Sequence, residues 1–247
     1  MQKAVSSDLL KFSIQQPSTA DKALTVLGTS IICVSFFFMI FPMVDLAVSQ
    51  WFARDQVFVL AEQPSLQAVR RIGRDGQIYL IGAMLLLMGL QAVGPKRYEF
   101  GQPHKPLFVL LSFAVGPFIV VHVLKFLIGR VRPRDLYEFG GSADFTPVWQ
   151  FSAACSRSCS FPSGESSAAA AALSLLVFVP ARLRGIAALA MVPFLLMIAF
   201  NRVLFGAHFL SDIMLGWLFT MFAMVLIWRW MEPRSDAICR FITRARR

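Results

Sequence analysis

Six apolar segments alternate with polar segments along the chain. Each is about 16 to 23 residues long, which suits an α-helix that crosses roughly 30 Å of hydrocarbon. The pattern therefore predicts an all-α, polytopic membrane protein whose six transmembrane helices form one domain over residues 1–247. The predicted spans are about 24–44, 77–93, 106–128, 164–180, 185–200 and 208–228.

The segments outside these spans have distinct characters. Residues 45–76 form a long predicted loop whose aromatic and aliphatic side chains indicate a short helix at the membrane surface. A basic turn covers 96–105, and a long polar segment covers 129–163. The polar N-terminal arm, 1–23, is too long and too polar for a simple signal peptide, so we expect the first span to be retained.

Composition supports the membrane assignment. Hydrophobic residues make up 57% of the chain and charged residues 15%, and the mean hydropathy is +0.63. These values are far from those of a soluble domain. The net charge of +10 fits basic residues that set topology and meet anionic lipid. Nucleic acid is not expected as a partner, since the sequence has no basic stripe or base-stacking module.

The distribution of basic residues predicts the orientation. With six spans, both termini lie on one side of the membrane. Slightly more than half of the 24 lysines and arginines lie in the segments on that side. Because such residues are enriched on the cytoplasmic side, we expect the arm 1–23 and the basic tail 229–247 to be cytoplasmic. The loops after the third and fifth spans then share the opposite face.

The segment between the fifth and sixth spans carries candidate chemistry. His208 and Asp212 are four residues apart, so they share one face if a helix begins here. A carboxylate in that position can fix one imidazole nitrogen as a donor and leave the other free as a base or nucleophile. Arg202 supplies a planar guanidinium group that suits phosphate or carboxylate. The simpler alternative is a structural polar cluster at a helix end.

A second polar cluster follows the third span. Lys125, Arg130, Arg132 and Arg134 lie within ten residues, just before and around Pro133. Cations at a helix C-terminus are favoured by its dipole, and snorkelling toward the membrane surface is the simpler explanation. Four cations exceed what a membrane anchor requires, so we expect them to bind a dianionic ligand.

A third polar cluster begins the alanine-rich fourth span. Ser163 and Gly164 precede a helix whose first N–H groups are free to bind an anion. Ser163 equally fits an ordinary N-cap, and Glu165 an ordinary first-turn acid. On the predicted topology all three clusters reach the same membrane face. Together they supply cations, N–H donors and a histidine–aspartate pair for attack on phosphorus.

The four cysteines do not form a metal-binding pattern, and we expect no metal and no cofactor. Cys155 and Cys159 are close together in the polar segment. A disulfide between them is expected if that segment faces an oxidising compartment. Two free thiols are an equally good interpretation of the sequence.

The ordered motifs now identify a resemblance. Lys125-x6-Arg132-Pro133, then Pro162-Ser163-Gly164, then Arg202-x5-His208-x3-Asp212 resemble the three-part signature of the type 2 phosphatidic acid phosphatase (PAP2) superfamily. The motifs cover roughly 125–212, and the six-span layout agrees over the whole chain. The resemblance implies a metal-independent membrane lipid phosphatase with a lipid phosphate as substrate.

The resemblance also implies roles for individual residues. His208 resembles the nucleophile that forms a phosphohistidine, and Asp212 resembles the residue that orients and polarises it. The implied phosphate-binding set is Lys125, Arg132, Ser163, Gly164 and Arg202.

Glu165 departs from the family pattern, which has a histidine that protonates the leaving oxygen. A carboxyl group can do this only with a raised pKa, and the neighbouring cations oppose that. Either Glu165 is a tuned acid, or the leaving group needs little protonation. We therefore favour lipid A 1-phosphate or undecaprenyl diphosphate as substrate, with phosphatidylglycerol phosphate and phosphatidic acid as further candidates. The Pro-Ser-Gly-Glu variant is similar to lipid A 1-phosphatase-like members.

The sequence thus predicts a bacterial inner-membrane phosphatase with its site at the periplasmic face. Phe145 and Trp149 are candidates for shaping lipid entry, although plain membrane anchoring explains them more simply. One alternative is a lipid-to-lipid phosphotransferase that uses the same site. The other is a non-catalytic lipid-phosphate-binding transporter or scaffold, which the presence of both His208 and Asp212 disfavours. The sequence leaves the oligomeric state open.

Overall fold

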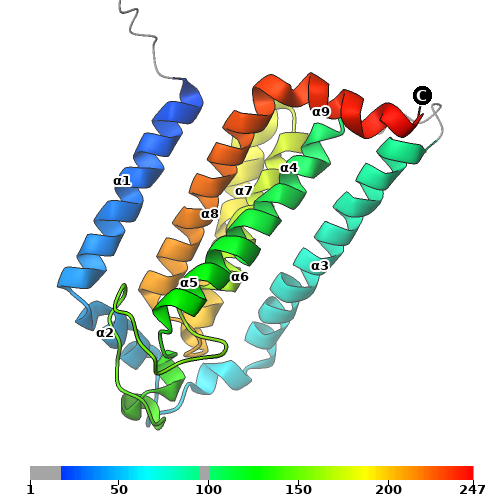
Figure 1. Cartoon of the computed structure of the whole chain (residues 1–247). Helices are drawn as coiled ribbons and strands as arrows, with labels where there is room; N and C mark the ends of the chain where they lie inside the picture. Colours follow the sequence, from blue (N-terminus) through cyan, green and yellow to red (C-terminus); the bar gives the residue numbers. More distant parts are fainter. Residues whose placement is uncertain (1–17, 95–100, 247) are drawn as a thin grey trace, which may run out of the picture.

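The computed structural model describes residues 18–94 and 101–246 (Figure 1). The basic residues at 96 and 97 and most of the predicted N-terminal arm lie outside these ranges. The described residues form helices and turns without a β-sheet. The α-helices are α1 (Thr19–Ile40), α2 (Met43–Phe52), α3 (Pro64–Val93), α4 (His104–Phe113), α5 (Val121–Ile128), α6 (Gly164–Ala172), α7 (Arg184–Leu204), α8 (Leu210–Met231) and α9 (Ser235–Ile242).

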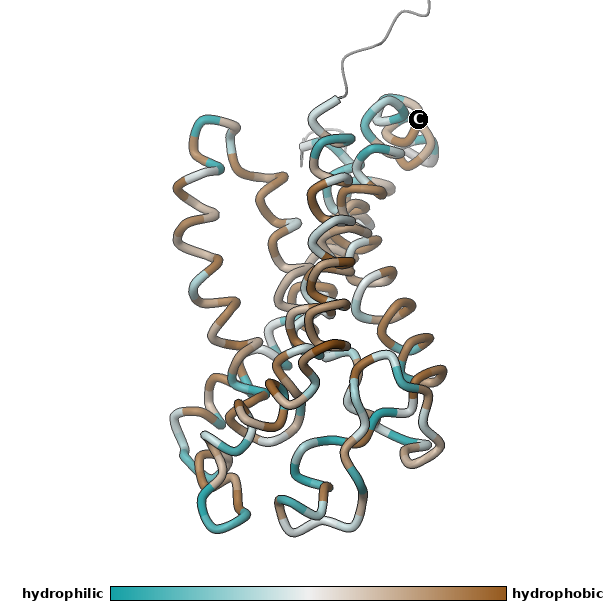
Figure 2. Tube along the Cα trace, turned by 90° about the vertical axis from the view of Figure 1, so that its left-hand side faces the viewer, coloured by the Kyte–Doolittle hydropathy of each residue, from teal (hydrophilic) through white to brown (hydrophobic). Residues whose placement is uncertain are grey.

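Five helical segments are long and apolar enough to cross a membrane. They are Thr19–Ile40, Pro64–Val93, His104–Asp135, Ala181–Leu204 and Leu210–Ile242. Figure 2 shows hydrophobic residues along these helices and hydrophilic residues in the loops at their ends. The all-α membrane fold is therefore confirmed, whereas a sixth crossing stays a prediction.

The predicted fourth span is a short, enclosed helix. It consists of α6 and the 3₁₀-helix Leu173–Phe178, which together are shorter than the roughly 20 residues that a crossing requires. α6 packs against α4, α7 and α8, and Ala170 and Ala171 are completely buried. Its small side chains let the neighbouring helices approach closely. Neighbouring helices therefore shield α6, which does not need to match the bilayer thickness.

The third span is one continuous helix with an irregular centre. The π-helical stretch Ala114–Val120 joins α4 to α5 and contains Pro117. Proline lacks a backbone N–H and its ring clashes with the preceding turn, so the wider π-helical geometry accommodates it. The helix ends at Gly129, whose φ of 63° lies in the left-handed region that favours glycine.

The prediction that residues 45–76 form a loop is largely wrong. A short helix does lie within it, since α2 begins at Met43, and its place at the membrane surface stays a prediction. α3 begins at Pro64 rather than near residue 77. The first turns of α3 carry charged side chains, so an apolar pattern detects only the later part of this helix. The basic tail is also helical, and α9 lies across the ends of α3 and α4 (Figure 1).

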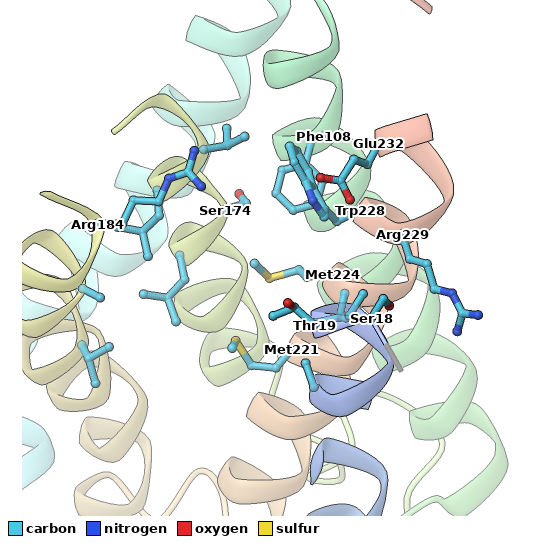
Figure 3. A pocket seen from close by; sticks show the side chains of 18 residues that line it. Ser18, Thr19, Phe108, Ser174, Arg184, Met221, Met224, Trp228, Arg229 and Glu232 are labelled. Carbon is cyan, nitrogen blue, oxygen red and sulfur yellow. The ribbon is translucent and has the colours of Figure 1, made fainter. Parts of the chain in front are cut away.

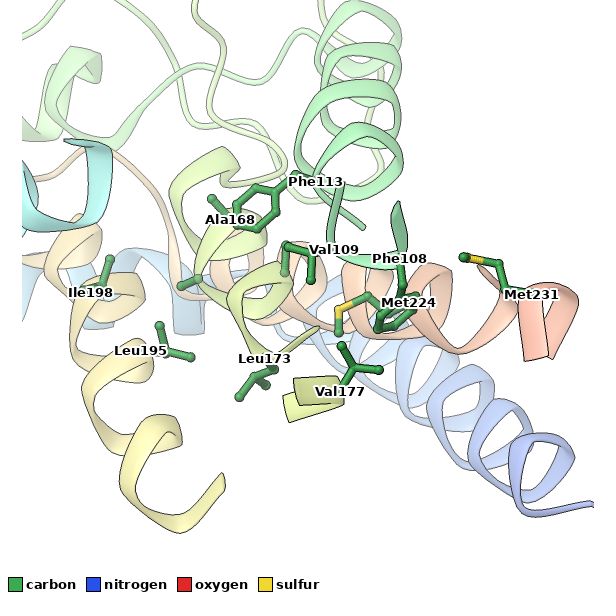
Figure 4. Close-up of a cluster of buried hydrophobic side chains, with 12 residues drawn as sticks. Phe108, Val109, Phe113, Ala168, Leu173, Val177, Leu195, Ile198, Met224 and Met231 are labelled. Carbon is green, nitrogen blue, oxygen red and sulfur yellow. The ribbon is translucent and has the colours of Figure 1, made fainter. Parts of the chain in front are cut away.

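A hydrophobic core holds α4, α6, α7 and α8 together (Figure 4). Phe108 and Val109 of α4 pack with Leu195 of α7 and Met224 of α8. Burial of such side chains stabilises the bundle by about 1.5–3 kcal/mol each. The core thereby fixes the helix ends that carry the three polar clusters.

A cavity of about 940 Å³ is drawn in Figure 3. It is lined at the start of α1 and the end of α8, which Figure 1 places at the opposite end of the bundle from α2 and the loop between α5 and α6 (the site loop). Its lining is mostly apolar and includes Ser18 at the start of α1 and Trp228 near the end of α8. Arg184, Arg229 and Glu232 add charge at its edge. None of the predicted site residues lines this cavity.

Candidate active site

A tight turn between α7 and α8 carries His208. The backbone N–H groups of Ala207 and His208 both donate to the carbonyl oxygen of Arg202, at 3.1 and 3.3 Å. Gly206 in this turn has a φ of 57°, and a Cβ there would lie 2.4 Å from the ring of Phe58. The turn therefore requires glycine both for its backbone conformation and for close packing.

His208 is almost completely buried beside Asp212. Its Nδ1 lies 3.7 Å from Oδ2 of Asp212, which is an ion-pair distance rather than a hydrogen bond. Burial lowers the pKa of the His208 imidazole to about 4, and this outweighs the opposing effect of the Asp212 carboxylate. The imidazole is therefore neutral near pH 7, as a nucleophile must be. Because Asp212 faces Nδ1, Nε2 is the nitrogen left for chemistry.

Three donors fix the Asp212 carboxylate. Nη1 of Arg130 donates to Oδ1 at 2.7 Å, the backbone N–H of Phe209 donates to Oδ2 at 2.9 Å, and the hydroxyl of Ser160 also donates to Oδ2. Asp212 has no exposed surface. These hydrogen bonds stabilise its negative charge and hold it in one orientation beside His208.

The prediction that Arg130 binds the dianionic ligand with its neighbouring cations is wrong, because Arg130 is the centre of a buried network of protein groups. It is completely buried, and its Nη2 donates to Oδ2 of Asp45 at 2.8 Å while Nη1 bonds Asp212. Its guanidinium group also stacks 4.1 Å above the centre of the Phe209 ring. The Ser211 hydroxyl, which accepts from Arg130, donates to Asp45 at 2.5 Å. The network links α2, the segment after α5, and the start of α8.

One signal in the sequence could have identified Asp45. It lies directly after an apolar span, between Val44 and Leu46. A carboxylate so close to hydrocarbon needs a partner and marks a functional position by default. Burial raises the pKa of the Asp45 carboxyl group, and the adjacent Arg130 opposes this effect.

Arg202 and Glu165 face each other at the centre of the site. Nε of Arg202 lies 3.0 Å from Oε2 of Glu165, and Arg202 is 4% exposed. Neither Nε nor Nη1 of Arg202 forms a hydrogen bond with the described residues. A buried guanidinium with unused donors is costly unless it meets an anion.

Lys125 lies in the last turn of α5, and Arg132 lies in the segment between α5 and α6. Nζ of Lys125 donates to the carbonyl oxygen of Cys159, and Nε of Arg132 donates to that of Ser158 at 2.8 Å. The charges of both side chains act on Glu165. The structure thus brings the second and third polar clusters together, as their predicted common face requires.

The N-terminus of α6 lies against α8, next to Asp212. Ser163 is the N-cap, and its hydroxyl accepts from the backbone N–H of Ser166 at 3.3 Å. The N–H of Ser163 donates to the carbonyl oxygen of Asp212 at 3.0 Å. Gly164 is the first helical residue, and its N–H is among those that have no acceptor within a helix. This arrangement suits an anion that also contacts Arg202.

The remaining predicted residues lie in the loop between α5 and α6. The sulfur atoms of Cys155 and Cys159 are joined at 2.21 Å. Phe145 packs against Phe209 with ring centres 5.4 Å apart, and Trp149 packs against Phe161 at 5.1 Å. Both aromatic rings therefore support the loop. Among the described residues, no three His, Cys, Asp or Glu side chains are grouped so as to hold a metal ion.

Cations, a helix N-terminus and a histidine–aspartate pair lie at one end of this all-helical membrane bundle. Groups of these kinds are suited to binding a phosphate. The family profile described as PAP2 superfamily matches residues 105–236, which include all three clusters. The chain belongs to the PAP2 superfamily.

Curated relatives agree with this membership. A lipid A 4′-phosphatase from Rhizobium leguminosarum is 39% identical over 108 residues, which are 43% of this chain and 46% of that protein. One with the same name from Francisella tularensis subsp. novicida is 24% identical over 205 residues, covering 81% of this chain and 91% of that protein. The match thus spans less than half the length of the Rhizobium relative.

A solved structure shares the fold. It is the crystal structure of a transmembrane PAP2-type phosphatidylglycerolphosphate phosphatase from Bacillus subtilis. The two chains are 20% identical, with a TM-score of 0.57, and the match covers 85% of this chain and 96% of that one. At this identity the likeness concerns the arrangement of helices only.

Proposed function

We propose that this protein is an integral membrane lipid phosphatase in which His208 is the nucleophile. The observation that carries the proposal is a buried, neutral imidazole beside a fixed carboxylate, together with a buried guanidinium that has unused hydrogen-bond donors and whose charge acts on the imidazole. The carboxylate, Asp212, orients the ring, and the guanidinium, Arg202, binds the phosphate. A structural cluster would not require two buried groups with unsatisfied hydrogen-bonding atoms.

The proposed reaction has two steps. Nε2 of His208 attacks phosphorus in line, so an N–P bond forms while the bond between phosphorus and the lipid oxygen breaks. Lys125, Arg132, Arg202 and the first N–H groups of α6 stabilise the equatorial oxygens. Water then attacks the phosphohistidine, releasing inorganic phosphate and the neutral imidazole. No step requires a metal ion.

Glu165 is the proposed acid for the leaving oxygen. Its carboxyl group lies 3.0 Å from Nε of Arg202, the proposed phosphate-binding residue. Glu165 would then donate a proton to the departing alkoxide. If Glu165→Gln retains full activity at every pH tested, this role is wrong.

Lipid A is the proposed substrate class. The names of the relatives favour its 4′-phosphate, whose leaving oxygen is an ordinary sugar alkoxide that needs protonation by an acid such as Glu165. The anomeric 1-phosphate, like a polyprenyl diphosphate, has a leaving group that needs less help. Which of the two phosphates is removed from lipid A therefore indicates how much Glu165 contributes as the acid.

The proposed topology places the whole chain, 1–247, in one inner-membrane domain. The arm 1–23 and the tail 229–247 would be cytoplasmic, and the site would face the periplasm. This is supported by the position of the described chain ends, which lie at the opposite end of the bundle from α2 and the site loop (Figure 1).

A phosphate-release assay with purified protein tests the proposed function. The panel is lipid A, undecaprenyl diphosphate, phosphatidylglycerol phosphate and phosphatidic acid, each with and without a chelator. We expect release from lipid A, unaffected by chelation. Activity that requires added metal, or release from none of the four lipids, would contradict the proposal. Labelled phosphate that moves to a second lipid rather than to water would indicate a phosphotransferase.

A further inference from the structure

α3 packs against the end of α7 that carries Arg202. Nδ2 of Asn201, the residue before Arg202, donates to the carbonyl oxygen of Leu66 at 2.9 Å. Farther along, a Cβ on Gly73 would lie 2.7 Å from Cγ2 of Ile198. Leu66 and Gly73 are seven residues apart and therefore lie on one side of the helix. That side of α3 faces α7.

Arg70 lies on the same side, between these two contacts. It follows Leu66 by four residues and precedes Gly73 by three, which is the spacing of a single helix face. Its Nε is buried without a hydrogen-bond partner, and it forms no salt bridge with the residues that the structure describes. Its positive charge acts on both Arg202 and Arg132.

The sum of the charges in the site shows that Arg70 is one cation more than a single phosphate requires. Lys125, Arg132 and Arg202 carry three positive charges, and Glu165 offsets one of them. A single phosphate dianion therefore already neutralises this group. Arg70 is partly exposed, but it adds a buried Nε donor and a further cation whose charge acts on Arg202 and Arg132. Such a group is unfavourable unless additional negative charge is bound beside it.

We infer that Arg70 forms a subsite for a second anionic group of the substrate, next to the phosphate that reacts. This inference rests on the proposed phosphatase function and extends it to a substrate class. The substrate would carry two anionic groups, either as a diphosphate or as a sugar lipid with a further phosphate. The shared requirement is anionic oxygen within reach of the guanidinium of Arg70.

Paired substrates test the subsite. Steady-state kcat/KM is measured for a prenyl diphosphate and its monophosphate, and for lipid A with two phosphates and with one. Arg70→Gln is the test variant, and Arg70→Lys restores the charge. Arg71→Gln is the matched control, because Arg71 is exposed on the outer side of α3 beside Ile72 and Asp75. It removes the same charge from the same helix.

We expect Arg70→Gln to lower kcat/KM by about tenfold or more for a doubly anionic substrate, because one charge-assisted contact is lost. For the singly anionic partner of that substrate, kcat/KM should fall by less than about threefold. The pair that shows this difference identifies the source of the second group. Arg71→Gln should change neither value. Equal losses on both members of every pair, or no loss on any, would overturn the inference.

A binding measurement separates this inference from the proposed function. If the wild-type protein releases phosphate from no substrate, the phosphatase proposal fails. The subsite is then tested by the increase in unfolding temperature that pyrophosphate and orthophosphate each produce. The subsite predicts that pyrophosphate stabilises wild type and Arg71→Gln more than it stabilises Arg70→Gln, with orthophosphate equal in all three. Identical stabilisation of all variants by pyrophosphate would overturn it.

Discussion

At the scale of single residues, the site depends on one buried arginine whose hydrogen bonds all go to protein groups. Arg130 is the only described cation that contacts the Asp212 carboxylate, and it holds Asp45 at the same time. Breaking a buried ion pair leaves an uncompensated charge, which typically costs about 3–5 kcal/mol. Arg130 is therefore a positioning residue that acts on His208 through Asp212.

Arg130→Gln should lower both stability and turnover. We expect a loss of about 3 kcal/mol in the free energy of unfolding and a fall in kcat of about tenfold or more, with KM nearly unchanged. Thermal unfolding and steady-state kinetics measure the two effects. Arg134→Gln is the stability control, since the Arg134 side chain is about half exposed and its pair with Asp135 is long, at 3.8 Å. An Arg130→Gln protein with wild-type stability and kcat would disprove the role.

The buried imidazole of His208 should remain neutral under mildly acidic conditions. Burial holds its pKa at about 4 in the folded protein, whereas an unperturbed histidine has a pKa near 6.5. Between these values the unfolded chain binds the additional proton, so stability from this group is present above about pH 6.5 and is lost as the pH falls toward 4. Activity that depends on the neutral ring should persist through the same window.

Nitrogen chemical shifts of the imidazole test this ionisation. The chain has three histidines, so the double variant His104→Gln/His122→Gln leaves His208 as a single labelled histidine. We expect its shifts to stay those of the neutral ring from pH 7.5 to 5. A titration midpoint at or above 6.5 would show that burial does not control this group.

The sequence predicted that His208 and Asp212 are neighbours on the assumption that a helix begins at His208. The two residues are neighbours, but α8 begins at Leu210, and the turn that ends at His208 brings the imidazole beside Asp212. No such local rule connects Asp45 with Arg130, which are 85 residues apart in sequence. Their pairing depends on how α2 docks beside α8. The proximity of His208 to Asp212 was thus predictable from the sequence, and the network behind them was not.

At the scale of elements, the site depends on close contact between α6 and α8. A Cβ on Gly216 of α8 would lie 2.9 Å from the carbonyl oxygen of Ser163 and 3.1 Å from Oγ of Ser167. The backbone that begins α6 therefore has no space to move toward α8. Its N–H groups and the Asp212 backbone keep their positions because glycine occupies this site.

Gly216→Ala should impair the enzyme by displacing the start of α6. Overpacking of this kind costs about 1–3 kcal/mol in stability, and a small shift of a phosphate-binding group lowers kcat/KM by about tenfold or more. Gly82→Ala on α3 is the matched control, since a Cβ there meets nothing within 4 Å. It should unfold at or slightly above the wild-type temperature because alanine favours a helix. Equal behaviour of the two variants would contradict this account of the helix contact.

Hydropathy located the apolar parts of the helices and missed their ends. α3 extends through a charged region before its apolar part, so its start at Pro64 is not visible in an apolar pattern. α6 is short because neighbouring helices enclose it. Both features depend on tertiary packing, and the hydropathy of neighbouring residues in the sequence does not describe that packing.

At the scale of the whole molecule, segments distant in the sequence meet at one end of the bundle. The hydroxyl of Ser160 reaches Asp212 across 52 positions, and Arg202 lies beside Glu165. The sequence predicted this meeting through topology, because helix crossings place alternate loops on one face. It did not predict Arg70, since α3 was expected to begin after that residue.

The central claim is that His208 carries the chemistry of this site. Phosphate release by His208→Ala, measured beside the double variant His104→Gln/His122→Gln, tests it most directly. We predict no detectable phosphate release by His208→Ala, because loss of a nucleophile removes most of the rate enhancement. The double variant should release phosphate within about threefold of the wild-type rate, because the other histidines contact no reacting group. Substantial release by His208→Ala would contradict the account.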